Sequence, residues 1–499
     1  MAWRFYEEGL RAFFAPDWQV AKRMMGAALK EDSTFALAAY YDAVMTEDAA
    51  YEARQRALRL ARGAPERDRL MILADLLQKD QEPAALAAAE EWTAKYPDDA
   101  QAFATLGSTR AFAGDWAGAV AAFERAILLD LEAERTVPEG CRVCDGYGRL
   151  ADLYFWWDSL PAVERTARRH LDAHPDQPLP WATLALAAAR AGDSASALQH
   201  LRHYVAATAT RPDKGHELRI RLTLEDYEVV EREALPLLAS SREDDASMGR
   251  WLLLIALRNQ GRLTEAAHLL RTGQLRGETP SLVPVGVDYI NQALVALESG
   301  DPSRAASYFD TRRRGEPRAQ APGLHARWRA WNSTLTATAL AAVGDTLAVR
   351  QLADTVQYWG ERSLFGRDRK AHHFLRGLVL AAAGHHDEAV REYRAAVHSY
   401  TLGYTRVNYE LARSLLFLDR PSEAVAVLLP ALRGEIDAAN IYVTRTELHE
   451  LLARAYRRAG LPDSAAAHDR AVVRAWARAD RRFISRRQAA RQRLTCCMG

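Results

Sequence analysis

A CxxC motif is the first feature whose residue types and spacing could do chemistry. Cys141 and Cys144 stand at the start of an expected helix, where the helix dipole lowers the pKa of a thiol. They could form a redox pair or half of a zinc site. The other two cysteines, Cys496 and Cys497, are adjacent and fit a tetrahedral site badly. No βαβ pattern surrounds the motif. We therefore interpret the pair as structural and keep a redox pair and a disulfide as alternatives.

Closely spaced histidines could share a metal ion or act as general bases. They occur at His170 and His174, His372 and His373, His385 and His386, and His398. Two imidazoles without a third ligand or a paired carboxylate make an incomplete metal site, so we predict no metal. The sequence also has no GxSxG, HExxH, glycine-rich phosphate loop, HRD or DFG motif. We therefore expect no catalysis and no cofactor.

The end of the chain is strongly basic. Eight arginines between Arg474 and Arg493 stand against one acid, Asp480. This stretch is typical of a basic helical extension that could contact nucleic acid, anionic lipid or an acidic partner, and a solvated end is the alternative. The whole chain has 66 basic and 65 acidic residues. Its net charge of +1 therefore creates no general attraction to nucleic acid or membranes.

Helical hairpins must position these residues, and the stretch from Asp99 to Leu131 shows the pattern most clearly. Apolar residues fall on one helical face before and after an expected turn at Gly114-Asp115-Trp116. Gly107 and Ala119 have the small side chains that two closely crossing helices need. Phe123 can fill the space beside that crossing. The stretch thus predicts two helices that pack against each other.

The same pattern recurs along the chain. Further turns are expected at Gly192, Gly261, Gly300, Gly344, Gly384, Asp419 and Gly460. Small residues follow them at Ala197, Ala266, Ala305, Val349, Ala389, Ala424 and Ala465. Hydrophobic residues make up 49% of the chain, and alanine, leucine and arginine dominate, which favours helix nearly throughout.

The hairpin at Asp99 resembles the tetratricopeptide repeat (TPR), a unit of about 34 residues. The resemblance implies an all-α fold, an α-solenoid in which about a dozen TPR-like hairpins stack into a right-handed superhelix. The closing stretch from Leu448 to Trp476 and the opening EEGLRAFF are similar to helical arrays attached to bacterial serine/threonine kinases and transcriptional regulators. Neither a kinase motif nor a DNA-binding domain accompanies them in this sequence.

Breaks in the repeat pattern suggest four parts. We place N-terminal TPR-like repeats at 1–131 and middle repeats at 132–240, after a loop that contains Pro138 and Gly140. C-terminal repeats follow at 241–476, and the basic tail occupies 477–499.

The TPR resemblance also implies a binding surface, because the first helix of each hairpin in that family lines a concave groove. The corresponding residues here are Phe13, Phe14, Phe112, Asp152, Phe155, Trp156, Arg190, Tyr409 and Arg413, with Phe417, Glu450, Arg454, Arg457 and Arg458 further along the chain. Their aromatic character suits an apolar or helical peptide. The alternative is that the rings pack between neighbouring repeats. For Phe155 and Trp156 the two readings are balanced, since successive aromatic residues on one helix cannot all face one core.

We therefore expect a non-catalytic scaffold that binds a protein or peptide partner, in bacterial signalling or complex assembly. One alternative is a sensor array for a kinase or transcriptional regulator whose catalytic or DNA-binding domain is absent here. A second is nucleic-acid binding through the arginine-rich tail, which the neutral net charge disfavours. The chain starts without the features of a secretory signal, and no apolar run is long enough to span a membrane. We expect a cytoplasmic location, or an extracytoplasmic one if a further domain precedes this chain.

Overall fold

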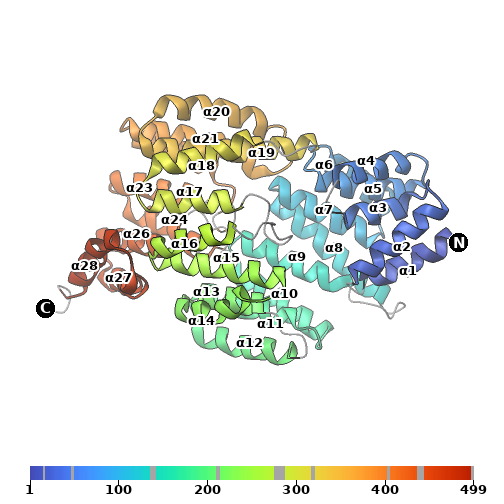
Figure 1. The fold of residues 1–499 in the computed structure, drawn as a ribbon, viewed down its shortest axis with the longest axis horizontal. Coiled ribbons are helices and arrows are strands. Elements are labelled where there is room, and N and C mark those ends of the chain that lie inside the picture. The colour runs from blue at the N-terminus through green and yellow to red at the C-terminus, as the bar shows by residue number, and fades with distance from the viewer. Residues whose placement is uncertain are drawn as a thin grey trace. The chain divides into compact units, whose positions relative to one another are not determined.

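The structure is a computed structural model that describes residues 1–14, 17–46, 50–134, 142–209, 214–274, 287–315, 321–399, 401, 405–434 and 443–495. Every regular element in these ranges is a helix (Figure 1), which confirms the all-α prediction. None of the described helices combines the length and the apolar character needed to cross a bilayer. The chain divides into two compact units, each built from separate stretches of sequence.

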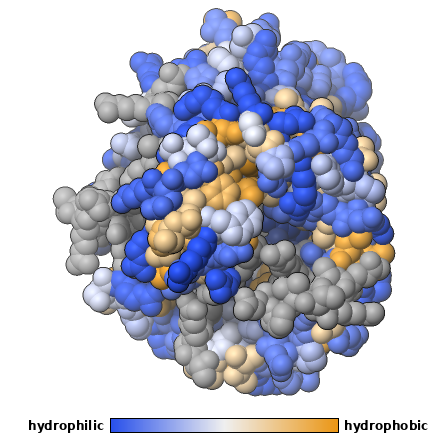
Figure 2. All heavy atoms as spheres, turned by 90° about the vertical axis from the view of Figure 1, so that its right-hand side faces the viewer, coloured by the Kyte–Doolittle hydropathy of each residue, from blue (hydrophilic) through white to orange (hydrophobic). Residues whose placement is uncertain are grey.

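Unit 1 consists of residues Met1–Leu153, Pro317–Trp328 and Trp359–Arg369. Its helices are α1 (Ala2–Phe14), α2 (Trp18–Glu31), α3 (Ala36–Val44), α4 (Ala50–Ala61), α5 (Glu66–Lys79), α6 (Ala85–Lys95), α7 (Ala100–Ala113), α8 (Trp116–Glu134) and most of α9 (Arg142–Trp156). The first turns of α19 (Pro322–Val343) and α21 (Gly366–Ala382) also belong to it. Figure 2 views the side on which the N-terminal helices lie, and hydrophobic side chains gather there in a patch among hydrophilic ones.

The hairpin of α7 and α8 forms as its sequence predicts. The side chain of Asp99 caps α7 by accepting a hydrogen bond from the backbone N–H of Gln101 at 3.1 Å. Gly114 ends α7 with a φ of 90°, a left-handed conformation that a side chain would strain. A Cβ atom on Gly107 would lie 2.8 Å from the ring of Phe123. The predicted close crossing of the two helices is therefore confirmed.

Unit 2 consists of residues Tyr154–Glu316, Arg329–Tyr358 and Lys370–Gly499. Its helices in chain order are α10 (Leu160–Ala173), α11 (Leu179–Ala191), α12 (Ser194–Ala207), α13 (Lys214–Thr223), α14 (Tyr227–Leu238), α15 (Glu243–Asn259), α16 (Leu263–Gln274), α17 (Val287–Glu298) and α18 (Pro302–Arg314). They continue with most of α19, α20 (Thr346–Gly360) and α21, and then α22 (His386–Ala396), α23 (Arg406–Phe417), α24 (Pro421–Arg433), α26 (Arg445–Arg458), α27 (Pro462–Ala475), the short 3₁₀ turn η1 (Trp476–Arg478) and α28 (Arg481–Thr495).

The turns of unit 2 occur where the sequence places them. The glycines expected there, Gly192, Gly261, Gly300, Gly344, Gly384 and Gly460, all have positive φ angles, and so has Asp419. The small residues that follow are buried in the helix crossings, from Ala266 and Ala305 to Ala424 and Ala465. Consecutive helices therefore pack as hairpins, and the predicted repeat architecture is confirmed. The hand of the superhelix stays a prediction.

The basic tail packs against unit 2. Phe483 and Ala490 of α28 are buried in the same apolar cluster as Trp476. The backbone N–H of Asp480 donates to the carbonyl of Gly261 at 2.9 Å, and the Asp480 carboxylate accepts from the backbone N–H of Thr264 at 2.8 Å. The described part of the tail is thus a packed helix. The two compact units join stretches that are distant in the sequence, so they are a different division from the consecutive parts predicted above. The predicted boundaries at residues 131, 240 and 476 stay a prediction.

Candidate functional site

A cavity of about 600 Å³ lies within unit 2, mainly among the first helices of successive hairpins. We call it the groove cavity. Its lining residues are Leu297 of α17; Thr338, Ala341 and Ala342 of α19; Leu378, Ala381 and Ala382 of α21; His386 and Tyr393 of α22; Arg406, Glu410, Arg413, Ser414, Leu416 and Phe417 of α23; and Arg454 and Arg458 of α26. The alanines on α19 and α21 leave the hollow open because they carry almost no side chain.

Helical periodicity brings the charged residues to one side of this cavity. Arg406, Glu410 and Arg413 follow each other at intervals of four and three residues on α23, so they share one face. Glu410 accepts a hydrogen bond from Arg413 at 2.8 Å and lies 3.9 Å from Arg406. Arg454 and Arg458 are one turn apart on α26. The lining thus has four arginines and one carboxylate, and it is cationic.

The two arginines of α26 differ in their contacts. Arg458 donates to Asp419 at 2.7 Å and to the carbonyl of Leu416 at 2.5 Å, so it is held in place. Arg454 is exposed, and it has no ion-pair or hydrogen-bond partner among the described residues. Its guanidinium group is therefore available to an anion that enters the groove cavity.

The groove cavity also presents an exposed aromatic ring. Phe417 is 70% exposed at the end of α23. Its ring centroid lies 3.9 Å from that of His386, and His386 Nδ1 is 3.3 Å from the hydroxyl of Ser414. Burial, assisted by the nearby positive charge of Arg413, lowers the pKa of His386. The imidazole is therefore neutral at physiological pH and supports the ring as an uncharged platform.

Tyr393 places a buried hydroxyl at the groove cavity. The residue is 0% exposed, and its ring packs on Gly377, where a Cβ atom would approach to 2.5 Å. The hydroxyl has no hydrogen-bond partner among the described residues. Burial raises the pKa of this phenol far above its usual range, and the charge of Glu410 adds to the rise. An unpaired buried hydroxyl costs free energy, which a ligand in the cavity would recover by accepting its hydrogen bond.

Four of the predicted groove residues line the groove cavity: Arg413, Phe417, Arg454 and Arg458. Tyr409 lies one turn before Arg413 on α23 and packs against the apolar core, and burial raises the pKa of its phenol to about 12. The groove interpretation is therefore retained for these four residues. Tyr409 supports the helix that carries it.

The predicted groove residues of unit 1 mostly contact other aromatic rings. Phe13 packs edge-on against Trp18 and Tyr41, with ring centroids 5.1 Å apart in both pairs. Phe112 packs edge-on against Phe365 at 5.8 Å. Asp152 is exposed on α9. These rings follow the alternative interpretation, in which they pack between neighbouring helices. The side chain of Phe14 lies outside the described residues.

The end of α9 is buried in unit 2. Phe155 is 3% exposed, and the guanidinium of Arg190 lies 4.1 Å above its ring. The hydroxyl of Thr401 donates to the carbonyls of Phe155 and Trp156 at 2.7 and 2.9 Å. Phe155 is therefore a packing residue in this structure, and an incoming peptide does not reach it. Trp156 is half-buried beside it.

Two other predicted features have separate outcomes. Cys141 and the side chain of Cys144 lie outside the described residues, so the proposed redox pair stays a prediction. In the part of the chain that the structure describes, no group of three or more potential ligands could hold a metal ion.

Several arginines of α28 are paired: Arg486 with Glu450, and Arg493 with Asp469. These ion pairs occupy groups that a nucleic-acid backbone would otherwise contact.

The groove residues expected from the sequence include Phe417, Arg454 and Arg458 but not Tyr393 or Arg406, which line the same cavity. Only first helices were considered, whereas Tyr393 is on a second helix. The signal was present, because Gly377 and Tyr393 repeat the relation of Gly107 to Phe123 sixteen residues apart. The two rings differ in the hydroxyl of Tyr393, which Phe123 lacks.

The chain has distant similarity to several solved structures. No protein-family model and no curated protein sequence matches this chain. Among solved structures, yeast Tom70 is 12% identical, with 92% of this chain and 96% of that chain covered and a TM-score of 0.35. A tetratricopeptide repeat protein from Parabacteroides merdae is 14% identical, with 63% and 96% covered and a TM-score of 0.30. The Cut9-Hcn1 hetero-tetramer of APC/C is 12% identical, with 99% and 95% covered and a TM-score of 0.31.

Proposed function

We propose that this chain is a non-catalytic helical-repeat scaffold that binds an acidic peptide segment of a partner protein in the groove cavity. The observation that carries the proposal is the combination of a surplus of arginines with the guanidinium group of Arg454, which has no partner among the described residues. Glu410 balances one of the four arginines, and Asp419 pairs with Arg458, which leaves two positive charges to be balanced. Acidic side chains of a peptide would supply the balance.

The shape of the groove cavity supports a peptide over a compact ion. A volume of about 600 Å³ accommodates several side chains. Phe417 offers an exposed ring for an apolar side chain of the same peptide, and the neutral His386 fixes the orientation of that ring. The hydroxyl of Tyr393 can donate to a carboxylate or a backbone carbonyl. Aromatic and arginine side chains commonly dominate the binding energy of such surfaces.

Nucleic-acid binding through the tail has less support. Arg478 contacts Glu231 at 3.0 Å, and the guanidinium of Arg487 donates to the backbone carbonyl of Trp476 at 3.1 Å. These contacts fix the arginines as structural partners of the last hairpins. The regulatory context, bacterial signalling and a cytoplasmic location stay predictions.

The test is a peptide array probed with the full chain and scored by net charge. We expect acidic peptides with a central aromatic or leucine residue to be retained. The affinity of the best peptide, measured by fluorescence anisotropy, should fall about tenfold in Arg454→Ala, equivalent to about 1.4 kcal/mol. It should also weaken as the salt concentration rises.

Arg470→Ala is the matched control. Arg470 is an exposed arginine of α27 that does not line the groove cavity, so its removal changes the net charge equally and should leave the affinity unchanged. Retention of peptides without regard to charge, or equal losses in the two variants, would show that the groove cavity is not the binding site.

A further inference from the structure

We propose that a second cavity of unit 2 binds a small organic phosphate monoester. This cavity has a volume of about 590 Å³ and is lined by residues of α10, α11, α12, α24, α26 and α27 and of the turn before α14. We call it the histidine cavity, after His449 and His468 in its wall. It shares no lining residue with the groove cavity.

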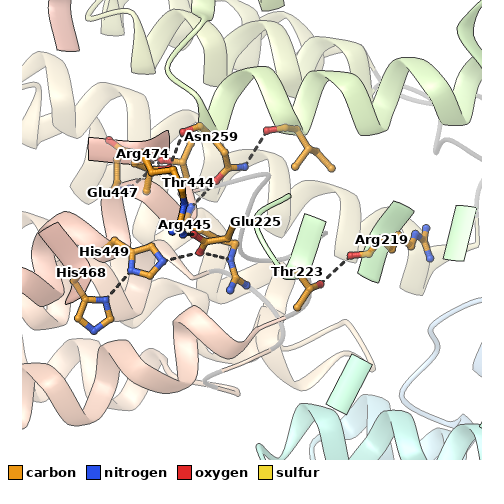
Figure 3. A network of polar contacts seen from close by, with 12 residues as sticks. Arg219, Thr223, Glu225, Asn259, Thr444, Arg445, Glu447, His449, His468 and Arg474 are labelled. Atoms are coloured by element: carbon orange, nitrogen blue, oxygen red, sulfur yellow. Dashed lines mark hydrogen bonds and ion pairs between the residues drawn. The ribbon is translucent and has the colours of Figure 1, made fainter. Parts of the chain in front are cut away.

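A carboxylate and two histidines form a connected chain in this wall (Figure 3). His449 Nε2 lies 2.6 Å from a carboxylate oxygen of Glu225, and His449 Nδ1 lies 2.7 Å from Nδ1 of His468. One proton must occupy the space between the two Nδ1 atoms, so one ring donates and the other accepts. Burial lowers the pKa of His468 to about 4, and the neighbouring His449 adds to this effect. His468 is therefore neutral at physiological pH.

Local structure holds this chain in place. Glu225 occupies the turn between α13 and α14 with a φ of 61°, an uncommon conformation for a residue with a side chain. The start of α26 is fixed because Thr444 and Glu447 form a capping box. The side-chain oxygen of Asn259 accepts from the backbone N–H of Arg445 at 2.9 Å (Figure 3). Arg445 and His449 are then one helical turn apart and reach the same carboxylate.

The histidine cavity has more positive than negative charge. Arg190, Arg433, Arg445 and Arg474 line it together with only two carboxylates, Asp158 and Glu225, which leaves a surplus of two positive charges. Although burial acts to raise the pKa of Glu225, His449 and the two nearby arginines lower it well below its usual range. The carboxylate of Glu225 is thus ionised, and its negative charge is included in the surplus of two positive charges given above.

Arg445 has a donor that nothing in the described structure uses. Its Nε atom lies 3.4 Å from Glu225, but its Nη1 atom is buried without a hydrogen-bond partner among the described residues, and the residue is only 6% exposed. A buried charged donor without an acceptor is costly. A ligand oxygen in the cavity would satisfy it.

These features together select the ligand class. A phosphate monoester carries about two negative charges at neutral pH, which matches the surplus. The planar guanidinium group binds phosphate oxygens with paired hydrogen bonds. Leu224, Leu429 and Leu432 add apolar wall to the same cavity, and its volume exceeds what an inorganic ion fills. An organic group attached to the phosphate would occupy that remaining space.

The test is isothermal titration of the full chain with phenyl phosphate, inorganic phosphate and malonate as probes. We expect phenyl phosphate to bind most tightly and to raise the melting temperature progressively, by an amount that grows with the logarithm of its concentration. Arg445→Gln should weaken binding about tenfold or more, because it removes the unused donor. Arg474→Gln should weaken it severalfold. Arg470→Gln, on the same helix as Arg474 but outside the cavity, should bind as the unmodified chain does.

Several outcomes would overturn the proposal. They are a melting temperature that phenyl phosphate leaves unchanged, tighter binding of malonate or inorganic phosphate, or equal affinities in Arg474→Gln and Arg470→Gln. If Arg445→Gln fails to fold, Arg474→Gln decides, since Arg474 is largely exposed and lies 3.6 Å from Glu225. Arg454→Ala should leave phenyl phosphate binding intact, so failure here is distinguishable from failure of the peptide site.

Discussion

Two hairpins of the molecule are built around the same contact and differ by one polar atom. In the hairpin of α7 and α8, the ring of Phe123 packs on Gly107, and in the hairpin of α21 and α22 the ring of Tyr393 packs on Gly377. Both rings are buried. Phe123 has no polar side-chain atom, whereas the hydroxyl of Tyr393 is unpartnered among the described residues and belongs to the wall of the groove cavity.

The comparison separates packing from function. In these two hairpins the close crossing places a flat ring on a glycine, and phenylalanine is sufficient for that contact. The additional hydroxyl of Tyr393 has no structural partner in the described part of the chain, so packing does not explain it. A ligand that accepts a hydrogen bond from this hydroxyl would explain its presence. Arg454, which has no partner among the residues that the structure describes, differs in the same way from Arg486 and Arg493 of α28, which are paired.

The largest effect should come from removing either ring. Phe123→Ala and Tyr393→Ala each leave a void beside a glycine that cannot fill it, and we expect each to cost about 3–5 kcal/mol of unfolding free energy. Thermal unfolding followed by circular dichroism measures the loss. Phe417→Ala is the control, because that ring is largely exposed and its removal should cost little. Comparable losses in all three variants would contradict the distinction between packing and exposed rings.

Acidification should lower the stability of unit 2 more than that of unit 1. Burial lowers the pKa of His170 and of His468 to about 4, with their neighbours His174 and His449 contributing. The unfolded chain binds these protons near pH 6.5, so unfolding becomes easier as the pH falls from about 6.5 to 4. Each histidine should cost unit 2 up to about 2 kcal/mol, with allowance for partial solvent access.

Unit 1 should respond differently to the same change. His325 is its only histidine in the sequence, and burial raises the pKa of its Asp42 and Asp80. Protonation of these two carboxyls as the pH falls relieves a cost, which offsets the loss expected at Asp32 and Glu66, where hydrogen bonds with Thr34 and Lys95 lower the pKa. Hydrogen exchange at pH 6.5 and 4.5, corrected for the intrinsic rate, should show lost protection in α10 and α27 before α5 and α6. Equal loss in both units would refute this assignment.

Adding a methyl group at either crossing should have a smaller effect. In Gly107→Ala and Gly377→Ala the new Cβ atom would lie 2.8 and 2.5 Å from the facing ring. Overpacking costs about 1–3 kcal/mol, which the better helix propensity of alanine offsets by up to about 1 kcal/mol. We expect lower melting temperatures for both. Gly26→Ala has no atom within 4 Å of the added Cβ and should be neutral or stabilising; a loss there as large as at the crossings would argue against overpacking.

The smallest effect in stability should be the most informative. Tyr393→Phe removes only the unpartnered hydroxyl, so the melting temperature should stay the same or rise by an amount equivalent to at most about 1 kcal/mol. Affinity for the acidic peptide should nevertheless fall severalfold. The reciprocal Phe123→Tyr adds a hydroxyl to a buried ring that lines neither the groove cavity nor the histidine cavity, so it should destabilise without affecting binding. A clear loss of stability in Tyr393→Phe would show that the hydroxyl serves the fold.

The sequence by itself determined the repeat architecture. Helices, glycine turns and buried small residues follow from local propensity and from periodicity, which is why the turn at Gly114 and the crossing of Gly107 with Phe123 were predicted correctly. These features depend on residues that are close along the chain, so local physical rules suffice for them.

Only the tertiary structure decided which residues form sites. Phe155 and Arg413 have similar positions in the repeat pattern, but Phe155 is buried against the segment at Thr401 and Arg413 borders a cavity. Glu225 and His449 are 224 residues apart in the sequence and lie in contact. Such pairings depend on how distant helices pack, because a side chain's exposure is set by what covers it, and periodicity carries no information about that covering.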